Sequence, residues 1–168
     1  MSRKLLAVTV MLAVTVYQIH MAFAADEAVF IDGTGYKVAF YQDAGRIVSL
    51  APNITEMIYF LELDDKLVGE SSFCNYPPES AAVPTVGGFV DTSLEKIISL
   101  DPDLVIGYQG NSLELITQLR QVGITVLAFN EAASVAEVGD QMVVLYQVAQ
   151  AAPGELPEPL VQWSKKLA

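Results

Sequence analysis

The sequence predicts an α/β fold in which a single doubly wound lobe is built on a mostly parallel four-stranded sheet and carries an N-terminal hairpin. Apolar runs of strand length alternate with helical runs from residue 46 to residue 149, the order that builds a parallel sheet covered by helices. The run Leu104-Val105-Ile106 is apolar without alternation, as expected for a strand with helices on both faces. The chain has 168 residues and is 52% hydrophobic, which is enough for one domain with its own core.

Residues 1–24 have the three parts of a secretory signal peptide. Arg3 and Lys4 supply the positive start, residues 5–16 are apolar and uncharged, and Ala22-Phe23-Ala24 has the small residues of a cleavage site. The alternative is an uncleaved membrane anchor, but the apolar run is shorter than the roughly 20 residues that span a bilayer. We therefore expect cleavage after this segment and export to the periplasm.

Charge and scarce residue types exclude several classes of function. A net charge of −11 with only 9 Lys and Arg argues against nucleic-acid binding, which needs a basic surface. Loss of the leader, which holds two cations and none of the 20 acidic residues, would change the charge from −11 to −13. Cys74 is the single cysteine and His20, in the leader, the single histidine. The mature chain is therefore expected to lack a disulfide, a cysteine or histidine metal site and a Ser-His-Asp triad.

The one candidate nucleophile is Cys74. No histidine of the mature chain is available to activate it, and a lone cysteine is more often a small buried apolar residue. We therefore predict no enzymatic activity, no resident cofactor and no bound metal.

The N-terminal part predicts a hairpin followed by the first core strand. Residues 29–32 and 36–40 flank Gly33-Thr34-Gly35, and glycines supply the positive φ that a tight turn needs. After a second turn, residues 46–50 form the first core strand.

A helix is expected directly after that strand. Asn53 precedes Glu56 by three residues and both stand before an apolar run, which is typical of a helix start. The free N–H groups there could hold an anion or a carbonyl group of a ligand. The alternative is a plain helix cap without a ligand.

Aromatic side chains concentrate on loops after the second strand, residues 66–71. The proline-rich loop 73–78 carries Phe73 and Tyr76, and the connection 83–91 carries Phe89. Such rings either form lids over the core or gather at one sheet edge as the wall of a flat apolar ligand site.

The centre of the chain combines a helix, a strand and a further aromatic residue. Thr92 and Glu95 read as a capping box for a helix that Asp101-Pro102 ends by forcing Asp101 into an extended conformation. Tyr108 then follows the strand Leu104-Val105-Ile106. Because open α/β sheets bind ligands at the carboxyl ends of their strands, Tyr108 is a candidate ligand contact. The alternative is a half-buried packing residue.

The second half continues the alternation. Residues 111–122 predict a helix with Leu113, Ile116 and Leu119 inward and Gly123 after its end. Residues 124–129 predict the fourth strand. Ser134 and Glu137 begin a helix that reaches about residue 149, and residues 160–167 form a short helical remnant.

Six short motifs occur in an order and spacing that resemble the N-terminal lobe of the iron-siderophore and cobalamin periplasmic binding proteins of ABC importers, and most of all the cobalamin-binding members. They lie at residues 46–56, 68–69, 75–78, 86–88, 94–97 and 102–106. Each motif alone is weak, whereas six in order are specific.

The resemblance implies two α/β lobes joined by a long helix, with the ligand held in the cleft between them. It implies that residues 25–150 are the N-terminal lobe, that residues 151–168 are the start of the inter-lobe helix, and that a second lobe is absent from this sequence. It further implies cobalamin or a related corrinoid as ligand and the permease of an ABC importer in the inner membrane as partner.

The resemblance also implies functional residues. Tyr76, Phe89 and Tyr108 fall on aromatic residues that pack on the corrinoid, although the cobalamin-binding members have Trp at the last two positions. Glu95 falls on the glutamate that docks on arginines of the permease. The rest of the expected ligand site is made of Pro52, Asn53, Gly88 and Gly110.

Two other functions remain open at this point. A ferric siderophore or haem binder of the same family is one, although such ligands favour cationic residues and the loops named above carry no Arg or Lys. An interaction module that docks on a permease or oligomerises without capturing a ligand is the other.

Overall fold

The computed structural model describes residues 28–40, 43–150 and 157–167. The predicted signal peptide, residues 1–24, and the first part of the predicted inter-lobe helix lie outside these ranges. Within them, no helix combines the length and the apolar character needed to cross a membrane.

The core sheet consists of four strands in the order β4-β3-β5-β6. Their bounds are Ile47–Ser49 for β3, Leu67–Glu70 for β4, Leu104–Tyr108 for β5 and Thr125–Phe129 for β6. β3 pairs in parallel with both β4 and β5, and β5 pairs in parallel with β6. The carboxyl ends therefore lie along one edge, which confirms the predicted parallel sheet.

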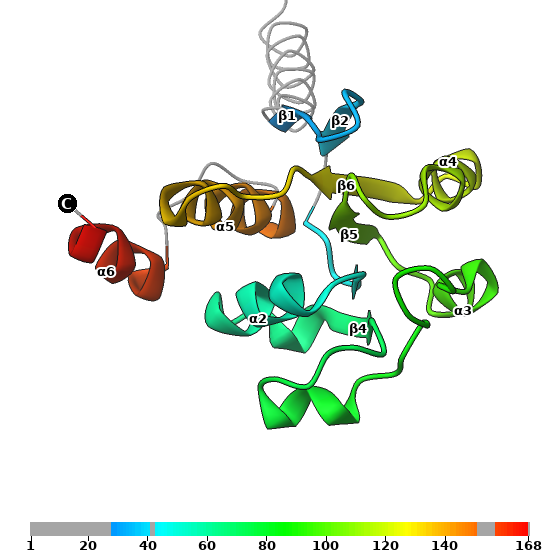
Figure 1. Ribbon diagram of the computed structural model, residues 1–168, viewed down its shortest axis with the longest axis horizontal. Coiled ribbons are helices and arrows are strands. Elements are labelled where there is room, and N and C mark those ends of the chain that lie inside the picture. Colours follow the sequence, from blue (N-terminus) through cyan, green and yellow to red (C-terminus); the bar gives the residue numbers. More distant parts are fainter. Residues whose placement is uncertain (1–27, 41–42, 151–156, 168) are drawn as a thin grey trace, which may run out of the picture.

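Helices cover both faces of this sheet (Figure 1). α2 (Pro52–Phe60) and α5 (Val135–Gln150) lie on one face, and α3 (Leu94–Ser99) and α4 (Leu113–Gln121) lie on the other. Each strand therefore buries alternate side chains in two separate clusters, which is why the strand sequences are apolar throughout. Ile47, Leu104, Ile106 and Leu127 belong to the cluster under α2 and α5, and Val48, Val105 and Val126 to the cluster under α3 and α4.

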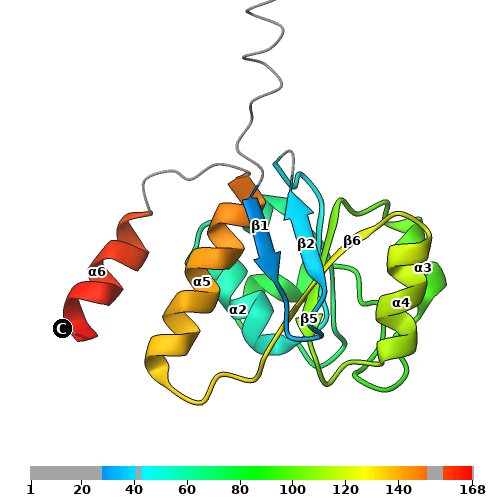
Figure 2. The same ribbon diagram turned by 90° about the horizontal axis from the view of Figure 1, so that it is seen from above.

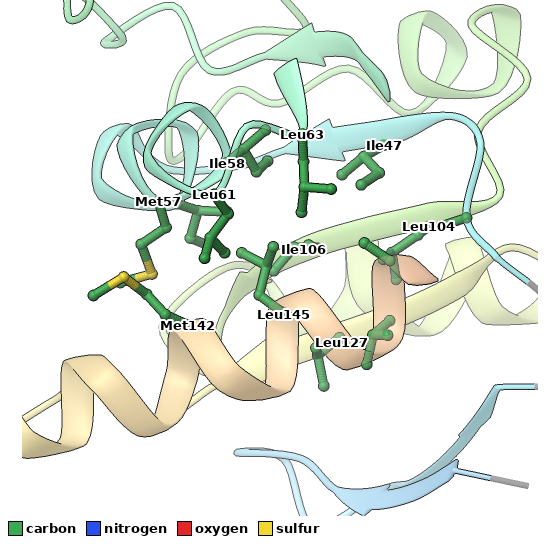
Figure 3. Packing of buried hydrophobic residues seen from close by; sticks show 14 of the residues in the cluster. Ile47, Met57, Ile58, Leu61, Leu63, Leu104, Ile106, Leu127, Met142 and Leu145 are labelled. Atoms are coloured by element: carbon green, nitrogen blue, oxygen red, sulfur yellow. The ribbon is translucent and has the colours of Figure 1, made fainter. Parts of the chain in front are cut away.

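The cluster under α2 and α5 closes with two methionines (Figure 3). Met57 of α2 and Met142 of α5 point toward one another, while Leu145 of α5 lies near Ile106 of the sheet. Both methionines are 6% exposed, and the flexible thioether side chain fills irregular gaps. The two helices therefore share a packed seam.

An antiparallel hairpin stands beside the sheet, as predicted. β1 (Ala28–Ile31) pairs with β2 (Lys37–Phe40), and β2 contacts the edge strand β6 (Figure 2). The Gly33 N–H donates to the carbonyl of Ala128 at 2.6 Å, so the hairpin turn is fixed to the end of β6.

Asp32 anchors this hairpin. Its Oδ1 accepts from the N–H groups of Thr34 and Tyr36, and its Oδ2 accepts from the Arg120 guanidinium at 2.5 Å and from the Ala128 N–H at 3.2 Å. The Asp32 side chain is 0% exposed and that of Arg120 15%. Burial acts to raise the pKa of Asp32, but the hydrogen bonds from Thr34, Tyr36 and Ala128 outweigh it and lower that pKa.

Shorter elements complete the lobe. Two 3₁₀ turns, η1 (Asp64–Lys66) and η2 (Pro78–Ala82), precede and follow β4, and α6 (Glu158–Leu167) contacts α5. Leu160 of α6 is 2% exposed and joins the cluster under α2 and α5.

Two predicted helix starts are wrong by one or two residues. The N-cap of α2 is Ala51 rather than Asn53, because Pro52 takes the first helical position, where its fixed φ suits a helix and its missing N–H costs nothing. The N-cap of α3 is Ser93 rather than Thr92, and the Ser93 hydroxyl accepts from the Lys96 N–H at 3.2 Å. Glu95 therefore forms no capping box with Thr92.

The predicted end of α3 also needs a correction. Asp101 is not extended but has a φ of 47°. The Arg46 guanidinium donates to the carbonyls of Leu100 and Asp101 at 2.6–3.0 Å, so these C-terminal carbonyls are bound where the backbone reverses.

The start of α4 differs in one inward residue. Leu113 is 63% exposed, and Leu115 packs inward in its place beside Ile116. The helix begins only at Leu113 after the Ser112 cap, so Leu113 faces solvent in the first turn. By contrast, Gly123 follows the helix end with a φ of 89°, and Ser134 with Glu137 caps α5, both as predicted.

Candidate ligand-binding site

Two hollows lie side by side near the carboxyl edge of the sheet, where β5 and β6 end and α2 begins. The Tyr108 hollow, of about 520 Å³, is lined by Asn53, Phe89, Tyr108, Gln109, Gly110, Glu131, Ala132 and Val138. The Tyr76 hollow, of about 540 Å³, is lined by Asn53, Glu56, Met57, Tyr59, Phe60, Tyr76, Pro77, Val138 and Met142. Because both linings include Asn53 and Val138, the two hollows adjoin.

The three predicted aromatic contacts all reach this double hollow. The Tyr76 side chain is 62% exposed, Phe89 is 44% exposed, and Tyr108 is half-buried. Two exposed rings and one half-buried ring offer flat apolar surface to a large ligand. Phe73 is also exposed, at 63%, but lines neither hollow.

A chain of hydrogen bonds fixes the Tyr108 hydroxyl. Asn53 Nδ2 donates to it at 2.5 Å, and the hydroxyl donates to Gln141 Oε1 at 3.3 Å. Gln141 Nε2 in turn donates to the carbonyl of Asn130 at 2.7 Å. The chain ties α2, β5, α5 and the residue after β6 together, so the elements around the site are held in one arrangement.

The surroundings keep Tyr108 protonated. Burial raises its pKa most, the negative charge of Glu131 raises it further, and the hydrogen bond from Asn53 lowers it. The net shift is upward, so Tyr108 is a phenol rather than a phenolate at neutral pH.

Glycines determine where Phe89 lies. A Cβ on Gly110 would stand 3.3 Å from Phe89 Cζ, so the bare backbone of Gly110 lets the ring rest on it. Gly88 donates its N–H to Asp91 Oδ1 at 2.9 Å, and a Cβ there would stand 2.5 Å from the same oxygen. Gly88 thus permits the turn before Phe89 but lines neither hollow.

Pro52 likewise lies outside the linings of both hollows. Its place at the first position of α2 sets the start of the helix that presents Asn53 and Glu56 to the site. Of the predicted ligand residues, the structure therefore gathers Asn53, Tyr76, Phe89, Tyr108 and Gly110, and gives Pro52 and Gly88 positions beside them.

Residues 47–152 match the profile of the periplasmic binding protein family. The chain belongs to that family. Its proteins are substrate-binding components of transporters.

Two relatives of this periplasmic binding protein show how far the similarity extends. YvrC of Bacillus subtilis, an uncharacterized ABC transporter substrate-binding lipoprotein, is 41% identical over 110 residues. The vitamin B12-binding protein of Vibrio cholerae is 37% identical over 103 residues. These matches cover 64% and 61% of the chain, but only 35% and 37% of the relatives. The chain thus spans about a third of the length of the curated relatives it matches.

Solved structures agree with this fold. The periplasmic vitamin B12-binding protein BtuF of Vibrio cholerae superposes with a TM-score of 0.64 at 30% identity, over 76% of this chain and 49% of that one. The heme-binding protein HmuT superposes with a TM-score of 0.67 at 26% identity, over 83% of this chain and 44% of that one. The described residues therefore have the fold of about one half of a periplasmic binding protein.

The charged residues that line the two hollows are both acidic. Glu56 lines the Tyr76 hollow and Glu131 the Tyr108 hollow, and neither lining contains a lysine or an arginine. Three cations of the described residues are engaged elsewhere: Arg46 at the end of α3, Lys66 on the carbonyl of Ala149, and Arg120 on Asp32.

The loop that carries Tyr76 rests on a buried polar cluster. The Cys74 thiol lies 3.2 Å from the Thr55 hydroxyl, and burial raises the pKa of Cys74 most, so the sulfur stays a thiol. Glu70, 1% exposed, lies in the same cluster, and burial raises its pKa as well. Within the described part of the chain no three metal-ligating side chains gather.

Glu95, the predicted docking residue, lies away from both hollows on α3. Its carboxylate accepts from the Ser93 hydroxyl at 3.0 Å. The hydrogen bond from its own backbone N–H, followed by that from Ser93, lowers the pKa of Glu95, which is fully exposed. The side chain is therefore an accessible anion on the α3 face.

Sequence reasoning missed several lining residues, among them Met57, Tyr59 and Phe60 of α2. Glu131 and Ala132 follow β6, so the rule that pointed to Tyr108, at the end of a parallel strand, would have found them. Val138 and Met142 lie in the first half of α5, where a sequence gives no sign that one side of a helix reaches a ligand site.

Proposed function

We propose that this periplasmic binding protein lobe binds cobalamin or a related corrinoid for an ABC importer and delivers it to the permease in the inner membrane. The observation that carries the proposal is the meeting of Tyr76, Phe89 and Tyr108 in two adjoining hollows at one sheet edge. The names of the Vibrio cholerae relatives support the ligand class. The signal-like residues 1–24 and the family support export to the periplasm.

Affinity in this proposal comes from covering flat apolar surface. Each 100 Å² of apolar area removed from water contributes about 2.5 kcal/mol. A corrin ring is flat and large enough to lie across both hollows, with Asn53 and Gln109 as polar contacts at its edge. Since the described lobe offers one wall, we expect micromolar rather than nanomolar affinity from this chain alone.

Isothermal titration of the chain with cyanocobalamin tests the proposal. We expect a one-to-one isotherm with a dissociation constant in the micromolar range. No heat at high micromolar protein would reject ligand capture by this chain.

Haem is the second candidate, because HmuT superposes with a TM-score of 0.67. Two features of the site oppose it. Neither hollow is lined by a lysine or arginine that would pair with the haem carboxylates, and the raised pKa of Tyr108 disfavours the phenolate that ligates haem iron. Titration with haemin followed by its visible absorption decides between the two ligands.

Docking on the permease belongs to the same proposal. Glu95 is an exposed carboxylate on α3 and could pair with a cationic residue of the permease. The alternative of an interaction module predicts instead a stable dimer in gel filtration, whose contact buries Tyr76 and Tyr108.

A further inference from the structure

Negative charge surrounds the aromatic hollows. Glu131 follows β6 and lines the Tyr108 hollow, and Glu56 lies in α2 and lines the Tyr76 hollow. Both side chains are exposed. The remaining side chains of the two linings are aromatic, aliphatic, thioether or amide groups, so these two carboxylates set the charge of the site.

The negative charge of Glu131 acts on Tyr108, which lines the same hollow. Besides burial, its negative charge is what raises the pKa of Tyr108. Two cations of the described residues are bound elsewhere: Arg120 pairs with Asp32, and Lys66 donates to the carbonyl of Ala149 at 2.8 Å. Aromatic faces, which also line the site, favour a cation over an anion.

We propose that Glu131 and Glu56 make the site selective for corrinoids that carry a net positive charge. The inference rests on the proposed function, because it requires a corrinoid to lie between the two carboxylates. A corrinoid whose cobalt carries water in place of cyanide gains one positive charge, since water is neutral and cyanide an anion, while the ring keeps its shape. The site then distinguishes two forms of the same vitamin by charge.

The expected size follows from Coulomb's law. One carboxylate at roughly 7 Å from the cobalt changes affinity by about three- to tenfold, with a dielectric constant between that of a protein surface and that of water. Salt screens exposed charges, so the preference should shrink as ionic strength rises.

The test compares aquocobalamin with cyanocobalamin at pH 6, in about 10 mM and about 200 mM salt. The chain is purified from the periplasm without a histidine tag, because imidazole ligates cobalt. At low salt we expect the wild-type protein to bind aquocobalamin about five- to twentyfold more tightly. This ratio should fall toward one in the double variant Glu131→Gln, Glu56→Gln, because loss of the two negative charges weakens aquocobalamin binding more than cyanocobalamin binding. Glu114→Gln, on α4 across the sheet, is the matched control and should keep the wild-type ratio.

The outcomes separate the two proposals. No binding of either form contradicts the proposed function itself. Equal affinities in the wild-type protein, or a ratio that the double variant leaves intact, contradict the charge selection alone. Direct ligation of cobalt by the Cys74 thiol would shift the visible absorption bands of aquocobalamin, and loss of the ratio in Cys74→Ser would overturn the electrostatic explanation.

Discussion

Asn53 Nδ2 lies 2.5 Å from the hydroxyl oxygen of Tyr108, and this contact joins the first turn of α2 to the end of β5. The residues are 55 positions apart in the sequence, yet they line the same hollow. The contact fixes the half-buried ring of Tyr108, so it links the stability of the lobe to the shape of the ligand surface.

Tyr108→Ala and Tyr108→Phe should separate these two contributions. Loss of about 60 Å² of ring contact should weaken cyanocobalamin binding by about 1.5 kcal/mol, roughly tenfold, in Tyr108→Ala. Tyr108→Phe keeps the ring and should change affinity less than threefold, but it removes the hydrogen bonds to Asn53 and Gln141 at a cost of about 1 kcal/mol in unfolding free energy. Titration calorimetry and urea denaturation measure the two effects.

Tyr36→Ala is the control for that prediction, since Tyr36 lies on the hairpin with its ring 4.0 Å from the Arg120 guanidinium carbon. It should leave ligand affinity unchanged. Equal losses in Tyr36→Ala and Tyr108→Ala would show that affinity follows general stability rather than the ring.

Gly110→Ala should displace Phe89. The added Cβ would stand 3.3 Å from Phe89 Cζ, so the ring has to shift by a few tenths of an ångström. We expect a several-fold weaker affinity for cyanocobalamin with a change in unfolding free energy below about 1 kcal/mol. Gly45→Ala is the matched control, because its Cβ would meet Asp103 Oδ2 at an ordinary 3.5 Å, and it should bind like the wild type.

Asp32→Asn should destabilise the lobe because it leaves the Arg120 guanidinium without its buried counter-ion. Removal of one partner of such a pair costs about 3–5 kcal/mol. The folded pKa of Asp32 is lowered. The stability that its ionised carboxylate contributes is therefore fully present above the unfolded pKa of about 3.9 and is lost as pH falls through the folded pKa.

Urea denaturation at pH 7 and pH 3 checks both statements. The difference in unfolding free energy between wild type and Asp32→Asn should be largest at pH 7 and shrink toward pH 3. A difference that stays constant with pH would mean that the ionised carboxylate is not what stabilises the hairpin.

Glu70→Gln should stabilise the lobe at neutral pH. Glu70 is 1% exposed and its Oε2 has no hydrogen-bond partner among the described residues. Burial raises its pKa, against the lowering effect of Cys74, so the protonated form fits the folded state better. The stability that the protonated Glu70 carboxyl contributes in the wild type is fully present below its unfolded pKa of about 4.3. It is lost as pH rises through the folded pKa.

Unfolding free energies at pH 4 and pH 8 test this. Glu70→Gln should match the wild type at pH 4 and exceed it by about 1–2 kcal/mol at pH 8. The exposed Glu62→Gln serves as control and should show no such gain. If Glu70→Gln is less stable than the wild type at pH 8, a partner in the folded state stabilises the ionised carboxylate of Glu70, which contradicts the prediction.

The sheet was predictable because its signal is local and strong. The strand Leu104-Val105-Ile106 is apolar on both faces, and pattern alone located it. Pattern also located the hairpin turn, where Gly35 has the predicted positive φ but Gly33 does not. Helix starts depend on one or two residues. The pattern therefore places the caps of α2 and α3 at Asn53 and Thr92, whereas Ala51 and Ser93 hold these positions in the structure.

The site was predictable only in part, for a physical reason. Tyr76, Phe89 and Tyr108 follow strands or lie on loops, and the parallel order brings such positions to one edge. Gln141, in contrast, reaches Tyr108 from the second turn of α5, and this distance depends on how α5 crosses the sheet, which no local pattern encodes.

The Asp32–Arg120 pair spans 88 positions, and the bond from the Ala128 N–H to Asp32 spans 96. The hairpin therefore cannot be locked in place until the second half of the polypeptide has been synthesised. Contacts so distant along the chain slow folding, because a long loop must close before they form. An N-terminal hairpin with such distant anchors reaches its final hydrogen bonding only once β6 and the end of α4 are in place.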